Sequence, residues 1–176
     1  MSRRNIAVLA LAGSALLACG NEPLTAGSRT AARALPPQAS RSATKLPFRG
    51  SLTTFEITVI APPNLLSNGT AQGTATDLGR FAMTFTAVVD LATGAGTGTY
   101  NFTAANGDLL SATFSGVGVN IEPNVASITE LATIVGGTGR FAHATGTFTV
   151  HRIITFDEVG NASGSGSLDG HISLNK

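Results

Sequence analysis

The chain is 176 residues long and carries a net charge of +1, with one cysteine, one tyrosine and no tryptophan. The balanced charge and the lack of a basic patch interleaved with aromatic residues argue against nucleic acid as a partner. A single cysteine excludes an intrachain disulfide framework and Cys-rich metal sites, so we expect packing alone to stabilise the folded part.

The N-terminal residues form a pattern typical of an export signal. Arg3 and Arg4 precede the apolar run IAVLALAGSALLA, which is too short for an ordinary transmembrane helix. The run ends in Leu-Leu-Ala-Cys at positions 16–19, which resembles the lipobox of bacterial lipoproteins. The resemblance implies cleavage before Cys19, diacylglycerol on its sulfur and acylation of the new amino group. An ordinary secretory signal followed by a chance cysteine is the alternative.

These observations divide the chain into three parts. We expect a lipoprotein signal peptide at 1–18, the acylated cysteine with a flexible linker at 19–45, and a folded domain at 46–176. The linker is rich in Ala, Ser, Thr, Pro and Arg and shows no sustained periodicity. By analogy with Gram-negative lipoproteins, Gly20 after the cysteine favours the outer membrane. The expected location is the cell envelope, with the membrane as a partner through the lipid anchor.

From residue 46 onward, short alternating runs separated by turn residues predict β-strands. In RFAMTFTAVVDL, the odd-numbered residues from Phe81 to Leu91 are apolar and point one way, while the even-numbered ones, Val88 among them, point the other. Asn106-Gly107 suits a type I′ hairpin turn, which needs positive φ at both central residues. The expected strands are 50–60, 69–77, 80–91, 97–104, 108–117, 126–135, 146–156 and 164–174.

These strands predict an all-β domain, a closed antiparallel barrel of about eight strands in meander order. An open sandwich is the alternative, but glycines within several strands favour the sharp bends of a small barrel. The large apolar residues share one strand face, and threonine and serine dominate the other. A transmembrane barrel would instead need an outward apolar band and aromatic girdles. We therefore expect the apolar face to point inward and the barrel to be soluble.

The stretch GGTGRFAHATG, residues 136–146, contains a match to the glycine fingerprint of dinucleotide-binding folds. The match is Gly137-x-Gly139-x-x-Ala142, with Asp157 downstream. Such a site needs a helix that begins in the glycine turn and binds the pyrophosphate at its N-terminus. The strand-like TFTVHRIITF follows too soon for that helix. The glycines are therefore expected to serve the backbone, and no cofactor is expected.

The same stretch is similar to a segment of plant dirigent proteins, GGTGxF followed by ARG, and more loosely to the equivalent segment of allene oxide cyclases. The resemblance implies an allene oxide cyclase/dirigent-like barrel with an apolar interior, a homotrimer, and a glycine turn with an inward phenylalanine at the barrel's end. Where dirigent proteins have Ala-Arg-Gly, this chain has Ala144-Thr145-Gly146 and lacks the arginine associated with their pocket. The residues of this structural glycine motif are Gly136, Gly137, Gly139, Phe141 and Gly146.

Two charged residues stand on apolar faces of predicted strands. Glu130 shares its face with Ile128, and Arg152 shares its face with Ile154. If the two strands pair across the glycine turn, both side chains enter the lumen, where a buried charge must be paired. We therefore predict a contact between Glu130 and Arg152. Both are candidate catalytic or ligand-orienting residues, and an internal structural ion pair is the alternative.

The histidines and serines form no strong catalytic or metal-binding pattern. His151 and His171 are expected to point outward from neighbouring strands without an evident third ligand, and His143 to lie on the surface or rim. Gly164-Ser165-Gly166 continues a strand and is not a nucleophile elbow. No metal is therefore expected.

Two functions remain open. The first is an envelope lipoprotein whose barrel binds a small apolar ligand or acts as an interaction module. The second is an isomerase, cyclase or dirigent-like protein that acts on a lipid or phenolic intermediate in the barrel cavity. A cavity of about 300 Å³ or more that exposes Glu130 would favour the enzyme. A filled lumen would leave no room for a substrate; the side chains that would fill it are Phe81, Phe85, Phe102, Phe114 and Phe148. The first function is the expectation.

Overall fold

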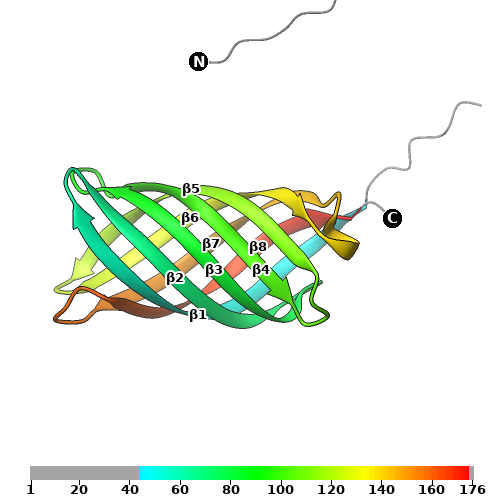
Figure 1. The fold of residues 1–176 in the computed structure, drawn as a ribbon, viewed down its shortest axis with the longest axis horizontal. Coiled ribbons are helices and arrows are strands. Elements are labelled where there is room, and N and C mark those ends of the chain that lie inside the picture. Colours follow the sequence, from blue (N-terminus) through cyan, green and yellow to red (C-terminus); the bar gives the residue numbers. More distant parts are fainter. Residues whose placement is uncertain (1–43, 175–176) are drawn as a thin grey trace, which may run out of the picture. The chain divides into compact units, whose positions relative to one another are not determined.

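The computed structural model describes residues 44–174, which form a closed barrel of antiparallel strands (Figure 1). Each strand pairs with the next in sequence, and the last pairs with the first, so the predicted eight-stranded barrel is confirmed and the open sandwich is wrong. The expected signal peptide, Cys19 and most of the linker lie outside the described residues. The strands are β1 (Lys45–Ala61), β2 (Asn64–Ala75), β3 (Gly79–Asp90), β4 (Ala95–Ala104), β5 (Leu109–Glu122), β6 (Val125–Gly137), β7 (Thr145–Phe156) and β8 (Ala162–Ser173).

Three strands extend five residues beyond their predicted bounds at one end. β1 begins at Lys45, inside the expected linker, because the residues that follow pair with the end of β8. β2 begins at Asn64 because the chain turns at Pro62–Pro63 and Asn64 pairs directly with Ala61. β5 continues to Glu122, where it still pairs with the start of β6. Polar and glycine residues that are typical of turns therefore lie within the ladders here.

The hairpin at Asn106–Gly107 is present, but it is not a type I′ turn. Gly107 has φ +87°, whereas Asn106 does not have positive φ. The Gly107 N–H donates to the Ala104 carbonyl at 2.9 Å, and the Ala104 N–H donates to the Asp108 carbonyl at 2.9 Å. The loop therefore spans residues 105–107 and ends in a left-handed glycine, a common three-residue hairpin connection.

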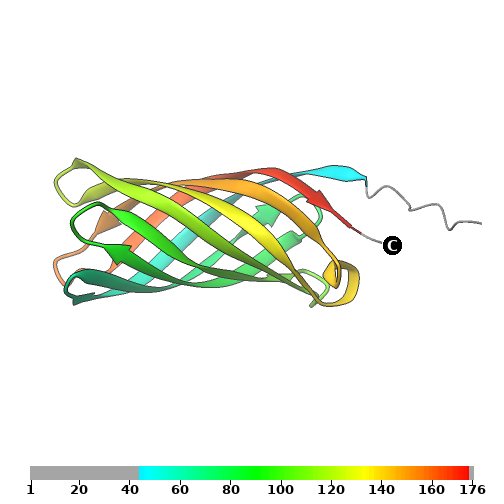
Figure 2. The ribbon, with the colours of Figure 1, turned by 90° about the horizontal axis from the view of Figure 1, so that it is seen from above.

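The barrel has two different ends. At the first, which we call the closed end, the start of β1 lies beside the end of β8, together with the β2–β3, β4–β5 and β6–β7 connections. The other four connections lie at the opposite, open end, on the left of Figures 1 and 2. No helix within residues 44–174 is long and apolar enough to cross a membrane.

The glycine motif lies at the closed end, between β6 and β7. It forms a single 3-10 turn, η1 (Gly139–Phe141), so no long helix follows the glycines, as expected. Gly139 has φ +52°, and a Cβ at Gly137 would lie 1.9 Å from the carbonyl oxygen of Leu109. Phe141 is fully buried and belongs to the core. The glycines therefore allow the chain to turn tightly while Phe141 packs inward.

Aromatic side chains fill the half of the lumen next to the closed end. The ring centroids of Phe48 and Phe148 lie 5.0 Å apart in an edge-to-face arrangement. Tyr100 stacks on Phe114 with 4.3 Å between centroids. All the phenylalanines that were expected to fill the lumen are buried, namely Phe81, Phe85, Phe102, Phe114 and Phe148.

On β1, the expected pattern is inverted in the half of the barrel next to the open end. On β1, Glu56 is buried, whereas Phe55 and Ile57 on either side of it are exposed. The expectation of an outer face made of threonine and serine is wrong for this part of β1, because Glu56 faces the lumen and apolar side chains face outward. Leu91, expected to point inward, lies in the β3–β4 turn and is 48% exposed. Other exposed aliphatic side chains of this half are Val59, Ile60, Leu66, Val88, Val117, Val119, Ile121 and Ile153.

Candidate ligand-binding site

A buried ion cluster separates the two halves of the lumen. The Arg152 guanidinium donates from Nη2 to Glu130 Oε1 at 3.0 Å and from Nε to Glu130 Oε2 at 3.1 Å. Its Nη1 donates to Glu56 Oε1. All three residues are 4% exposed. The predicted contact between Glu130 and Arg152 is confirmed, and Glu56 joins it to form what we call the ion cluster.

The barrel topology brings the three side chains together. Glu130 and Arg152 lie on the neighbouring strands β6 and β7, where the β6–β7 register offsets their positions by two residues on the same face. Glu56 lies on β1, and β8 runs between β1 and β7. Arg152 reaches across because its partner on β8 is Gly166, which has no side chain in the way. On β5, Gly116 leaves equivalent room for Glu130, since a Cβ there would lie 2.7 Å from Glu130 Cγ.

Neighbouring side chains complete the hydrogen bonding of the ion cluster. The Tyr100 hydroxyl donates to Glu130 Oε2, and the Ser67 hydroxyl donates to Glu56 Oε2 at 2.7 Å. The guanidinium carbon of Arg152 also lies 4.9 Å from the centroid of the Phe85 ring. Each carboxylate oxygen of the cluster therefore accepts at least one hydrogen bond, which is what stable burial of a charge requires.

The charges of the ion cluster do not balance. Burial alone would lower the pKa of Arg152, but the charges of Glu130 and Glu56 outweigh it and raise that pKa above its ordinary value. Arg152 therefore stays protonated. Burial also raises the pKa of Tyr100, and the charge of Glu130 raises it further, so the phenol remains a neutral donor. With both carboxylates ionised, the cluster carries a formal charge of −1 from two carboxylates and one guanidinium.

A cavity of about 450 Å³ extends from the ion cluster to the open end. We call it the lumen cavity. Glu56, Glu130 and Arg152 line it at its inner end, and the β3–β4 turn from Asp90 to Gly94 lines it at the rim. Its volume is within the range of small-molecule sites, and its mixture of apolar walls and a few buried polar groups is typical of them. The apolar side chains that line it are Leu65, Ala87, Val89, Leu91, Phe114, Val117, Val119, Ala126, Ile128, Ile154 and Phe156.

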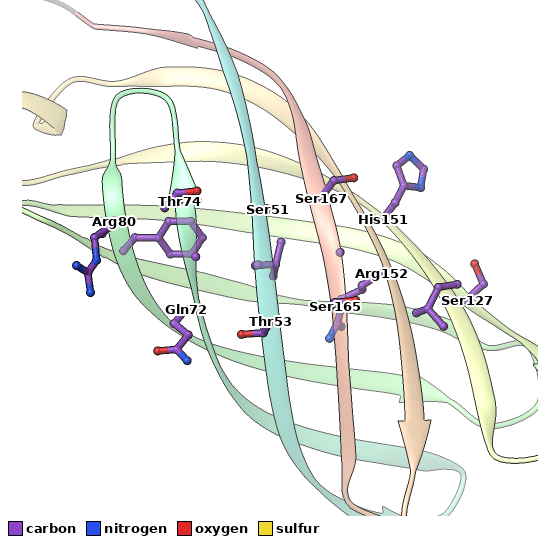
Figure 3. A pocket seen from close by; sticks show the side chains of 15 residues that line it. Ser51, Thr53, Gln72, Thr74, Arg80, Ser127, His151, Arg152, Ser165 and Ser167 are labelled. Carbon is purple, nitrogen blue, oxygen red and sulfur yellow. The ribbon is translucent and has the colours of Figure 1, made fainter.

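A second, larger hollow of about 900 Å³ lies on the outer surface and is lined mainly by polar side chains (Figure 3). Ser51 and Thr53 of β1 lie near its middle, with Arg80 on one side and His151 on the other. The Arg152 side chain is buried beneath this surface. Because the paired charged groups face the lumen, the smaller lumen cavity is the better candidate for chemistry or selective binding.

The histidines lie away from the lumen cavity. His151 is exposed, and its Nδ1 lies 3.1 Å from the Thr129 hydroxyl. In the β7–β8 ladder, His151 pairs with Ser167 and His171 pairs with Thr147. The two histidines are therefore offset from each other by four residues along the ladder. His143 is exposed beside η1, at the rim of the closed end as expected. Within residues 44–174, no group of three or more His, Cys, Asp or Glu side chains could hold a metal ion.

Sequence reasoning missed Glu56, Ser67 and Tyr100. Glu56 has the same parity as the buried Phe48, which could have placed it inside. Its apolar neighbours on β1 face outward. If they are assumed to face inward, Glu56 is wrongly placed on the outer surface. Ser67 begins the turn-like sequence Ser-Asn-Gly, and Tyr100 lies on a strand whose glycines weaken the apolar pattern. The catalytic roles considered for Glu130 and Arg152 stay predictions.

Comparisons with known proteins find similarity at the level of structure. No protein-family model matches the chain, and no curated protein matches it. Among solved structures, the chain is similar to the pterocarpan synthase dirigent protein GePTS1, with 16% sequence identity and a TM-score of 0.49. The match covers 83% of this chain and 99% of that chain. The barrel topology and the ion cluster described above do not depend on this likeness.

Proposed function

We propose that the protein binds a small, mainly apolar molecule in the lumen cavity, with the polar end of that molecule against the ion cluster. The observation that carries the proposal is a cavity of about 450 Å³ whose apolar walls end on buried charged groups. Aromatic side chains fill only the other half of the lumen. Burial of an apolar body would supply the binding energy, and the few polar groups would orient the ligand.

Obstruction of the cavity tests this proposal. Ala87 of β3 lines the lumen cavity, whereas Ala82 of the same strand faces outward and is exposed. With the neutral fluorescent probe N-phenylnaphthylamine, we expect saturable binding to the wild-type barrel. Ala87→Phe should weaken it by about tenfold or more, which is about 1.4 kcal/mol of binding free energy. Ala82→Phe is the matched control and should bind as the wild type does. Equal binding by both variants, or no saturable binding at all, would contradict the proposal.

The volume of the lumen cavity favours a second candidate, an isomerase or cyclase that acts on a lipid or phenolic intermediate. The cavity exceeds the volume of about 300 Å³ that was expected to favour an enzyme, and Glu130 lines it. Glu130 lines the lumen cavity beside the neutral Tyr100 hydroxyl, and a carboxylate next to a phenol could move a proton at a bound substrate. However, both oxygens of Glu130 already accept hydrogen bonds from Arg152. A carboxylate held in this way has less capacity to accept a substrate proton, so we favour binding over catalysis.

We also propose that Cys19 is acylated and anchors the barrel at the cell envelope, which rests on the sequence alone. In a Gram-negative host, metabolic labelling with an alkyne fatty acid should mark the full chain. Cys19→Ser should abolish the label and release the protein from the membrane fraction, since several acyl chains provide the stable anchor. Unlabelled wild-type protein would contradict acylation and support an ordinary secretory signal.

A further inference from the structure

We propose that the lumen cavity selects molecules whose apolar body ends in a positively charged amine, and that it discriminates against fatty acids and other apolar carboxylates. This inference rests on the proposed binding function and names the chemical class of its ligand. It follows from the distribution of charge along the path that a ligand would take, from the rim to the inner end of the cavity.

The inner end of the cavity carries excess negative charge. Two buried carboxylates, Glu56 and Glu130, face one guanidinium. Arg152 is not a free anion receptor, because three of its five N–H groups already donate to these two carboxylates. A ligand carboxylate would give up its hydration beside a cluster that already has more anions than cations. An ammonium group would instead offset the excess charge while donating hydrogen bonds to oxygens that have further lone pairs.

The rim of the cavity also carries negative charge. Asp90, Glu122, Asp157 and Glu158 lie at or beside the connections of the open end. Within residues 44–174, the lysine and arginine residues apart from Arg152 lie at or near the closed end: Lys45, Arg49, Arg80 and Arg140. Among residues 44–174, the charged side chains near the entrance are therefore acidic. Carboxylates around a cleft with low-dielectric walls raise the local concentration of cations.

The turns hold two of these rim carboxylates in place. Asp90 Oδ1 accepts from the Thr93 hydroxyl at 2.9 Å and from the N–H groups of Ala92 and Thr93. The hydrogen bond from the Thr93 side chain, followed by those from the backbone, lowers the pKa of Asp90. Asp157 Oδ1 accepts from the N–H groups of Val159 and Asn161 in the β7–β8 turn. The turns therefore fix both carboxylates in place, and the lowered pKa keeps Asp90 negatively charged at mildly acidic pH.

The walls between the rim and the ion cluster would hold the apolar body. Val89, Ile128 and Ile154 are among the side chains that line this part. The arrangement thus offers an acidic entrance, an apolar passage and a net-negative inner end. A neutral apolar molecule would use only the walls, whereas an amine would also gain the attraction of both charged regions.

Displacement of N-phenylnaphthylamine by probes with equal alkyl chains tests the inference. Dodecylamine should displace the dye from the wild-type barrel at a concentration about tenfold or more below that of dodecanol. Dodecanoate should displace it less well than dodecanol. Ala87→Phe should weaken displacement by the amine, which places that binding in the lumen cavity, and added salt should narrow the gap between the amine and the alcohol.

Two sets of variants assign the selectivity to the charges. Glu56→Gln with Glu130→Gln leaves the guanidinium in excess and should remove the preference for the amine. Because these residues are buried, the exposed pair Glu122→Gln with Glu158→Gln provides a test that does not disturb the core, and it should reduce the preference about threefold. Asp77→Asn at the closed end is the control and should change nothing.

The outcomes separate the inference from the function on which it rests. If neither the dye nor dodecanol binds, the proposed binding function fails and the inference fails with it. If both bind but dodecylamine has no advantage, or dodecanoate displaces the dye equally well, the binding function stands and the inference is wrong. An unchanged preference in both carboxylate double variants would likewise overturn it.

Discussion

Replacement of Arg152 by methionine is expected to lower the free energy of unfolding by about 3–5 kcal/mol at neutral pH. The substitution keeps most of the side-chain volume but leaves Glu56 and Glu130 buried without their cation. Urea denaturation monitored by circular dichroism at neutral pH measures this loss.

A surface ion pair provides the matched control for this experiment. Arg49 Nε lies 2.8 Å from Asp169 Oδ1, with the two side chains 69% and 64% exposed. Arg49→Met should cost only about 0–1 kcal/mol, because water solvates both charges whether or not they pair. Addition of Glu56→Gln and Glu130→Gln to the Arg152 variant should restore part of the lost stability. Equal stability of Arg152→Met and the wild type would reject the structural role of the ion cluster.

Above about pH 10, the barrel is expected to lose about 1.4 kcal/mol of stability per pH unit through Tyr100. Burial raises the pKa of this phenol in the folded state, and Glu130 raises it further, whereas the unfolded phenol titrates near 10. The unfolded chain therefore releases a proton that the folded barrel retains. The contribution is fully present below about pH 10 and is lost as the pH rises.

The composition of the chain makes this measurement specific. Tyr100 is the only tyrosine and there is no tryptophan, so tyrosinate absorbance reports on one residue. We expect that absorbance to develop together with the loss of the circular dichroism signal. Tyr100→Phe should remove the alkaline slope and, through the hydrogen bond lost to Glu130, cost about 1–3 kcal/mol at neutral pH. Ionisation near pH 10 in a barrel that remains folded would disprove the burial argument.

The fold could be predicted because the local signals agree over most of the chain. Alternation of apolar and polar residues marks the strands, and glycine-containing turns separate many of them. The Asn106–Gly107 turn was placed correctly but given the wrong type, since the same dipeptide also suits a three-residue loop. The predicted strand at 69–77 begins five residues too late. Ser-Asn-Gly at 67–69 is a turn-like sequence, and only its pairing with β1 and β3 shows that it belongs to β2.

The candidate site could be predicted only in part. Glu130 and Arg152 interrupt apolar faces, so parity alone places them inside and in contact. Glu56 escapes this reasoning because the apolar residues of its segment, Phe55 and Ile57, face outward. The rule that inward residues are apolar applies where a core fills the lumen. It does not apply to β1 where a cavity with buried polar groups replaces the core. The reversal of the pattern on β1 is therefore itself a signal of a cavity.

The two ends of the described barrel meet, since Lys45 pairs with Ser173 at the closed end. The entrance of the lumen cavity lies on the opposite side of the molecule. A reporter domain, a purification tag or a bead joined directly to Lys45 or Ser173 would therefore be attached at the closed end, away from that entrance. Barrels immobilised in this way would form a layer in which each entrance faces the bulk solution, which suits the design of a biosensor.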